Sequence, residues 1–176
     1  SNAEGSGIGD AAAPYLPNDR VWQMSGDFTM TKACECAAEN WVVGNFVHSF
    51  AKAYIQAGYL AEGRNLLILK TAVGGTGFVD KRWGINDDLF LRMMEMTQTA
   101  LSLNPENRLV AFLWHQGETD AIGNVSYETH FQNLTQLLNT FRTQFHCPDL
   151  PAVAGDFVQQ WKQENPEICR PIIRAI

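Results

Sequence analysis

The 176-residue chain carries little charge, and few of its residues are basic. Charged residues make up 18% of the sequence, below the roughly 25% that is usual in soluble domains. Its 13 lysine and arginine residues stand against 19 acidic ones, which gives a net charge of −6. Sequence-independent binding to a phosphate backbone relies on clustered positive charge. The composition therefore argues against a nucleic-acid partner.

Long hydrophobic runs and cofactor motifs are also missing from the sequence. No apolar stretch approaches the roughly 18 residues of a membrane-spanning helix. The glycine-rich segment 74–77 lacks the Lys-Ser/Thr pair of a phosphate-binding loop, and there is no dinucleotide-binding fingerprint. The four cysteines do not have the spacing of a zinc site. We therefore expect no membrane span, no metal and no organic cofactor.

The cysteines do not define a disulfide framework either. Cys34 and Cys36 are too close in the chain to bond comfortably to each other. Either of them could pair with Cys147 or Cys169, and the sequence leaves this choice open.

Apolar residues are plentiful, at 45% of the chain, so a sizeable core can form. Four short apolar runs predict buried strands, and these are residues 20–24, 66–73, 109–114 and 152–157. Helical spacing of apolar residues predicts helices over 46–57, 87–103 and 127–145, and a last one near 167–176. Asn86 and Ser126 are expected to cap the second and third of these helices. Pro171 must lie in the first turn of the last helix or kink it.

Alternation of strands with helices predicts an α/β fold, namely a three-layer α/β/α sandwich with a mostly parallel sheet. Each predicted strand is nearly all apolar, as expected when helices cover both faces of the sheet. We expect residues 1–176 to form a single domain. Ligands of such sheets bind at the carboxyl ends of the strands, so the residues that follow each apolar run are the candidates for chemistry.

Two of these strand-end loops are rich in glycine and polar residues. Residues 74–77 (Gly-Gly-Thr-Gly) follow one run, and residues 115–120 (His-Gln-Gly-Glu-Thr-Asp) follow another. Glycine lets backbone N–H groups approach a substrate closely, and such groups together with a side-chain amide can form an oxyanion hole. Taken alone, the first loop is more simply a tight turn. Taken alone, Gln116 is explained equally well as an amide that hydrogen-bonds a backbone group. Glu118 and Asp120 are explained equally well as solvated acids of a loop.

Taken together, the loops resemble a known family. Residues 114–121, Trp-His-Gln-Gly-Glu-Thr-Asp-Ala, resemble the W-H-Q-G-E-[ST]-D-A block of the SGNH hydrolases, in their sialate O-acetylesterase-like and acetylxylan-esterase-like branch. Residues 72–76, Ala-Val-Gly-Gly-Thr, with Trp83 downstream, are similar to the family's A-x-G-G-T block and its following tryptophan. Residues 1–5, Ser-Asn-Ala-Glu-Gly, are similar to the second part of its G-Q-S-N-[AM]-x-G block. The resemblance spans the whole chain and implies an SGNH, flavodoxin-like sheet.

The resemblance also implies an activity, which is hydrolysis of O-acetyl esters on a carbohydrate such as sialic acid or a xylan-type glycan. Ser1 would be the nucleophile, and its own N–H, Gly74 or Gly75, and the amide of Gln116 would hold the oxyanion. The residues expected to bind substrate or support the site are Asn2, Thr76, Trp83, His115, Glu118 and Asp120. Glu118 and Asp120 would brace the loop of Gln116, and Trp83 is either a core residue or a platform for a sugar ring. Family habit favours an extracytoplasmic location.

The sequence departs from the family pattern at the catalytic base. The family's base is a histidine in a D-x-x-H block, and no histidine of this chain has an aspartate three residues before it. The four histidines are His48, His115, His130 and His146, and we expect all of them to be structural or supporting residues. The absent base motivates the alternative function, a non-catalytic carbohydrate-binding module on the same fold.

The start of the sequence allows two interpretations. Ser-Asn-Ala is also a sequence that commonly remains after cleavage of an expression tag. Glu4 and Gly5, however, continue the family block. We therefore interpret Ser1 as native. A nucleophile of this type follows a strand, so we expect the 176 residues to be part of a longer protein, without its first strand and its C-terminal block.

Overall fold

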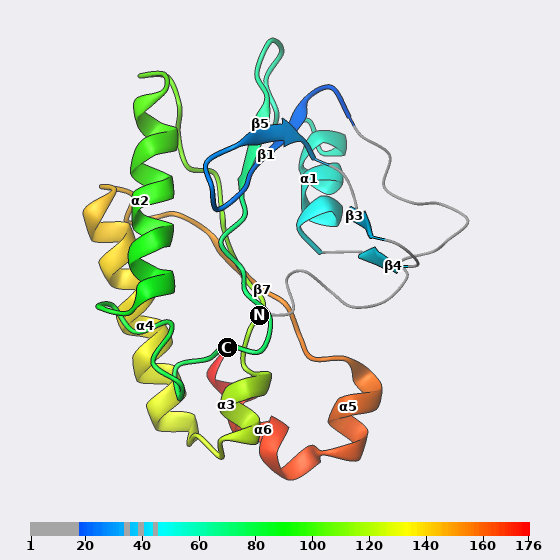
Figure 1. Cartoon of the computed structure of the whole chain (residues 1–176), viewed down its shortest axis with the longest axis vertical. Helices are drawn as coiled ribbons and strands as arrows, with labels where there is room; N and C mark the ends of the chain where they lie inside the picture. Colours follow the sequence, from blue (N-terminus) through cyan, green and yellow to red (C-terminus); the bar gives the residue numbers. More distant parts are fainter. Residues whose placement is uncertain (1–17, 34–35, 39–40, 44–45) are drawn as a thin grey trace. The chain divides into compact units, whose positions relative to one another are not determined.

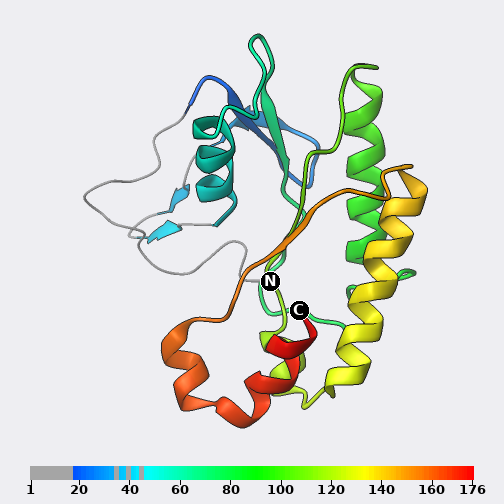
Figure 2. The same ribbon diagram turned by 180° about the vertical axis from the view of Figure 1, so that it is seen from behind.

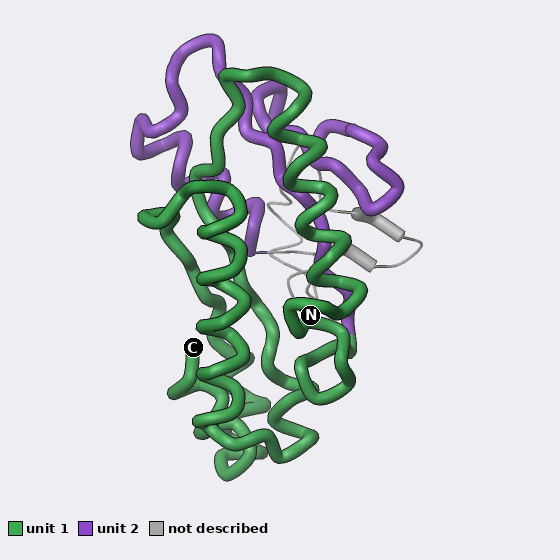
Figure 3. Tube along the Cα trace, turned by 90° about the vertical axis from the view of Figure 1, so that its left-hand side faces the viewer, with its two compact units in different colours: residues 1, 75–176 green, residues 2–74 purple. Residues whose placement is uncertain are grey.

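The computed structural model describes residues 18–33, 36–38, 41–43 and 46–176 (Figure 1). Ser1 and Asn2, which the family resemblance places in the active site, lie outside these residues. The chain divides into two compact units (Figure 3), residues 2–74, here called the N-terminal unit, and residues 1 and 75–176, the C-terminal unit. The prediction of a single domain stays a prediction.

The N-terminal unit is built on a three-stranded sheet with the order β2-β1-β5. Strand β1 (Val21–Met24) pairs in parallel with β5 (Leu66–Leu69) and antiparallel with β2 (Met30–Lys32). Strand β3 (Cys36–Ala38) pairs antiparallel with β4 (Trp41–Val43). Helix α1 (Phe46–Gln56) follows β4 and precedes β5 in the chain. The guanidinium of Arg20 donates to the carbonyls of Ala61 and Arg64, which ties the start of β1 to the segment before β5.

The C-terminal unit holds the second parallel pair, β6 (Phe112–Trp114) with β7 (Ala152–Ala154). Its helices are α2 (Asp88–Ser102), α3 (Glu118–Ile122), α4 (Tyr127–Gln144), α5 (Gln159–Glu164) and α6 (Pro166–Ala175). Helix α6 packs against α3 and α4, and the three lie side by side in both views of the chain (Figures 1 and 2). Buried Ala121, Phe157, Cys169 and Ile172 form the core of this packing.

The α/β fold predicted from the alternation of strands and helices is confirmed. The parallel pairs β1–β5 and β6–β7 belong to separate sheets, one in each unit. The prediction that every strand is covered on both faces is wrong for β7, whose three residues are all exposed. Among the described residues β7 has β6 as its one strand neighbour, and Val153 at its centre is 38% exposed.

The predicted helix starts were right in one case and wrong in another. Ser126 caps α4, and its hydroxyl accepts a hydrogen bond from the N–H of Thr129 at 3.2 Å. The residue at the N-cap position of α2 is Asp87 rather than Asn86, and its side chain makes no capping hydrogen bond. Its carboxylate instead accepts a hydrogen bond from the N–H of Gly84. Pro171 lies inside α6.

Cys147 and Cys169 are free thiols, so the pairings that the sequence left open for them are not formed. Burial raises the pKa of both thiols, which makes them poor nucleophiles. Cys34, one of the two potential partners, lies outside the described residues. No helix in the described part of the chain combines the length and apolar character needed to cross a bilayer.

Candidate functional site

The carboxyl ends of β6 and β7 meet at one edge of the C-terminal unit. The parallel ladder continues past both strands, because the N–H of Gly155 donates to the carbonyl of Trp114 at 2.8 Å. The ring of His115 lies directly against Gly155, where a methyl group would come within 2.9 Å of its Cγ. Gly117 is packed as tightly against Phe157. The polar loop 115–120 is therefore anchored at the edge where ligands of parallel sheets bind.

Gln116 joins this loop to the glycine-rich loop that begins at Gly74. Its side chain is 1% exposed, and its amide Nε2 donates to the carbonyl of Thr76 at 3.1 Å and to Asp120 Oδ2 at 3.3 Å. Reversing the amide would turn Oε1 towards a carbonyl and a carboxylate oxygen, which repel it. The orientation of the amide is therefore fixed by these two acceptors.

Asp120 is the centre of the hydrogen-bonded cluster. It is fully buried, its Oδ1 accepts from the N–H of Val79 at 2.8 Å, and its Oδ2 lies 3.0 Å from Nδ1 of His130. Burial alone would raise the pKa of this carboxyl. Hydrogen bonds from His130 and from the N–H groups of Val79 and Phe78, together with the charge of His130, lower the pKa below its ordinary value. Asp120 is therefore a carboxylate at neutral pH.

Gly74 and Gly75 are the exposed glycines of this loop. A methyl group on either would meet no atom of the described residues within 4 Å. Gly75 has a φ of 69°, a conformation that favours glycine. This arrangement allows a ligand to approach the backbone closely. The predicted role of one of these N–H groups in an oxyanion hole stays a prediction.

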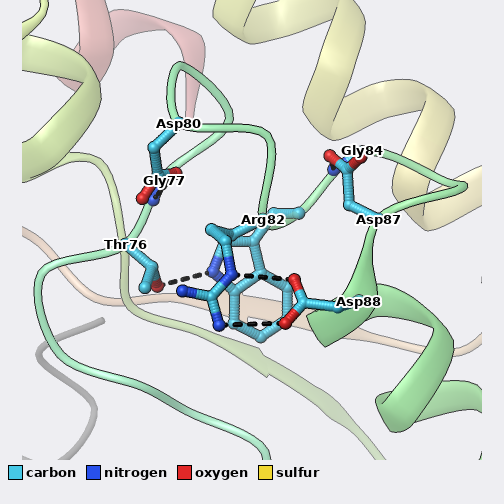
Figure 4. Close-up of polar contacts among 8 residues, drawn as sticks. Thr76, Gly77, Asp80, Arg82, Gly84, Asp87 and Asp88 are labelled. Atoms are coloured by element: carbon cyan, nitrogen blue, oxygen red, sulfur yellow. Dashed lines mark hydrogen bonds and ion pairs between the residues drawn. The ribbon is translucent and has the colours of Figure 1, made fainter.

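Thr76 is held by the indole of Trp83. The indole N–H donates to Thr76 Oγ1 at 2.9 Å (Figure 4), and the Trp83 ring meets Trp114 edge-on with centroids 5.5 Å apart. Trp83 is only 3% exposed. Of the two interpretations left open for this residue, its burial favours the core residue over the sugar platform. It supports Thr76, whose carbonyl in turn orients Gln116.

Carboxylates fix the rest of this loop, which sequence reasoning did not anticipate. Asp80 accepts a hydrogen bond from the N–H of Gly77 at 2.9 Å, and Arg82 binds both carboxylate oxygens of Asp88, at 2.8 and 2.9 Å (Figure 4). The available signal was local, since an acidic side chain can reach back to the backbone N–H three residues before it.

The remaining predicted site residues, His115 and Glu118, are half-buried. His115 is half-buried against Gly155, and its charge helps to lower the pKa of Asp156, which Lys162 lowers chiefly by a hydrogen bond. Glu118 is half-buried in the first turn of α3, where the helix dipole favours an acid. The structure thus brings Thr76, Gln116 and Asp120 together.

Gly77 has no room for a side chain, because a methyl group there would lie 2.6 Å from Asp120 Oδ1 and 3.0 Å from Gln116 Nε2. We expect Gly77→Ala to displace the carboxylate and to lower the free energy of unfolding by about 1–3 kcal/mol, as overpacking does. Urea denaturation measures this change. Gly74→Ala is the control and should stay within about 0.5 kcal/mol of the wild type, because its methyl group meets no atom of the described residues within 4 Å. Equal stabilities of the two variants would contradict the packing argument.

Comparison with protein families and curated proteins gives consistent matches. A family model described as carbohydrate esterase, sialic acid-specific acetylesterase, matches residues 1–175. Over 93 residues the chain is 31% identical to a probable 9-O-acetyl-N-acetylneuraminic acid deacetylase of Escherichia coli strain K12, covering 48% of this chain and 28% of that protein. Over 86 residues it is 29% identical to a probable carbohydrate esterase of Arabidopsis thaliana, and this match covers 49% of this chain and 32% of that protein. The matches thus span about a third or less of each relative's length.

Solved structures share the fold. The X-ray structure of an Arabidopsis thaliana protein superposes with a TM-score of 0.72 at 21% identity, covering 92% of this chain and 65% of the other. The crystal structure of NanS superposes with a TM-score of 0.68 at 20% identity, and the match covers 96% of this chain and 67% of NanS. At this level of identity the likeness concerns the fold.

Proposed function

The chain belongs to the carbohydrate esterase family of sialic acid-specific acetylesterases, and from this membership we propose that it acts as a serine esterase that removes O-acetyl groups from a carbohydrate. The observation that carries the proposal is the family match over residues 1–175. The buried cluster of Gln116 and Asp120, at the carboxyl end of β6, supports it, because this is the edge where a parallel sheet binds its ligands.

In this proposal Ser1 is the nucleophile. A histidine base takes the hydroxyl proton while Oγ attacks the acetyl carbonyl, and the tetrahedral intermediate then expels the sugar oxygen, which receives that proton. Water next attacks the acetyl-enzyme, and acetate leaves as Ser1 is regenerated. By the family pattern the base belongs to a D-x-x-H block, which these 176 residues do not contain.

The oxyanion would be held by the N–H groups of Ser1 and of Gly74 or Gly75, and by the amide of Gln116. The exposed glycines support this assignment, because a ligand oxygen can reach their backbone. Both amide hydrogens of Gln116 already have acceptors, so donation to the oxyanion would replace or share the longer contact, 3.3 Å to Asp120. Each such donor is worth about 3–4 kcal/mol in the transition state.

The first substrate to test is suggested by the relatives. The Escherichia coli relative is named as a probable deacetylase of 9-O-acetyl-N-acetylneuraminic acid, so a 9-O-acetylated sialic acid is the first choice and an acetylated xylan the second. The acetyl group is common to both, and its carbonyl is the part of the substrate that the nucleophile and the oxyanion donors would contact.

The proposal is tested with the complete gene product, which is incubated with 9-O-acetyl-N-acetylneuraminic acid, acetylated xylan and p-nitrophenyl acetate. We expect catalytic release of acetate from at least one of the two carbohydrates, measured by an enzyme-coupled acetate assay, with heat-denatured protein as the control. Binding of the acetylated sugar in calorimetry without any release of acetate would overturn the esterase and favour the carbohydrate-binding module.

A further inference from the structure

Asp120 on α3 and His130 on α4 form a buried acid–base pair that no step of the proposed hydrolysis uses. Both side chains are 0% exposed, and Asp120 Oδ2 lies 3.0 Å from His130 Nδ1. The imidazole meets the ring of Phe78 edge-on at 5.3 Å. At this distance from a carboxylate oxygen only a protonated Nδ1 is attractive. The contact therefore requires a hydrogen on Nδ1 of His130.

The same carboxylate holds two parts of the proposed site. It accepts from the N–H of Val79, in the loop that follows Gly74 and Gly75, and from the amide of Gln116. Without the donor at His130, a buried carboxylate would lose a main source of its stabilisation, and protonation is the ordinary relief for such a group. A protonated Asp120 would offer an O–H where it now offers an acceptor. An O–H at this position would repel the N–H of the Gln116 amide, and the amide would lose one of the two acceptors that hold its orientation.

We propose that His130 is a positioning residue, which acts through Asp120 to keep the amide of Gln116 in its observed orientation. The inference rests on the proposed esterase function, since Gln116 is a predicted oxyanion donor of that reaction. His130 is the ionisable group in the described residues whose hydrogen bond and charge lower the pKa of Asp120. Of the charged groups on the adjoining loop, Asp80 is engaged by the N–H of Gly77, and Arg82 by Asp88.

Two substitutions of His130, whose new side chains have a similar branched shape, separate the effect of its N–H donor from the effect of its packing. His130→Asn keeps an N–H close to the position of Nδ1, and His130→Leu removes it. We expect His130→Leu to lower kcat for acetate release about tenfold, because small displacements of positioned groups are costly, with KM changed less than about twofold. His130→Asn should restore most of the loss. Should His130→Leu fail to fold, His130→Phe replaces it, since its ring fills the site without a donor.

The pH profile gives a second measurement. The site requires ionised Asp120, and removal of the lowering contacts raises its pKa. Activity of His130→Leu should therefore fall at a higher pH than that of the wild type as the solution is acidified, and His130→Asn should lie between them. If His130 were purely structural, its replacement would change the stability of the protein but not the pH at which activity falls on acidification.

The third measurement does not depend on activity. The side-chain amide resonances of Gln116, identified by their loss in Gln116→Leu, should shift in His130→Leu and return towards the wild-type position in His130→Asn. Identical amide shifts and identical kcat losses in the two variants would overturn the role of His130. Absence of acetate release by the wild type would overturn the proposed function instead, and the amide resonances would still decide the orientation of Gln116.

Discussion

Replacing Ser1 with alanine is expected to lower kcat for acetyl-ester hydrolysis by at least about 10³-fold. The variant lacks the oxygen that forms the acetyl-enzyme, so only the oxyanion donors and substrate binding can still contribute. KM should change little, because the hydroxyl contributes its interaction in the transition state. Release of p-nitrophenol from p-nitrophenyl acetate by the complete gene product measures the change.

Ser102→Ala is a suitable control for this experiment. Ser102 is exposed on α2, and its hydroxyl only donates to the carbonyl of Thr99 at 2.7 Å, so kcat should stay at the wild-type level. A fluorophosphonate, which forms a covalent bond with an activated serine, should label the wild type and Ser102→Ala but not Ser1→Ala. Turnover retained in Ser1→Ala would show that Ser1 is not the nucleophile and would favour its interpretation as a residue of a cleaved tag.

The sequence predicted the longer elements because apolar residues recur in them at the spacing of a strand or a helix. The ends of the strands depend on which strands pair with each other, and this pairing cannot be read from the sequence. The apolar run 66–73 predicts a longer strand than β5, which ends at Leu69, where its partner β1 ends at Met24. Strand β6 likewise begins at Phe112, opposite the first residue of β7. The three residues of β2 are exposed or half-exposed and carry no apolar pattern.

The candidate site was predictable where a motif carried it. Gln116 and Asp120 stand four residues apart in the block after β6, and the structure brings them within hydrogen-bonding distance. His130 was expected to be a structural or supporting residue, but its contact with Asp120 was not predicted, because that contact depends on how α3 and α4 pack. Phe131, an apolar residue of the helix predicted over 127–145, is 46% exposed.

The buried face of α4 instead consists of His130, Leu134, Leu137 and Phe141. A histidine at the head of this otherwise apolar stripe was the available signal, since a buried polar side chain needs a partner.

Gly117→Ala is expected to destabilise the protein more than any other glycine substitution considered, by about 3 kcal/mol or more. Gly117 has a φ of 145°, a conformation in which a side chain costs about 1–3 kcal/mol. A methyl group there would also lie 2.6 Å from Ile172 Cγ2 and 2.9 Å from Phe157 Cζ, and overpacking of this kind costs a further 1–3 kcal/mol, roughly. Because α6 packs on α3 through Ile172, we expect a lower Tm and a lower urea midpoint.

Gly63→Ala separates the two causes of this loss. Gly63 has a φ of 73°, but a methyl group there meets no atom of the described residues within 4 Å, so this variant carries the backbone strain without the clash and should cost about 1 kcal/mol. In the double variant Gly117→Ala/Ile172→Ala the clash with Cγ2 is relieved, and the two losses should add to less than their sum. A Gly117→Ala variant no less stable than Gly63→Ala would show that α6 can move away from Gly117 at little cost, and that the glycine of this motif is not required by packing.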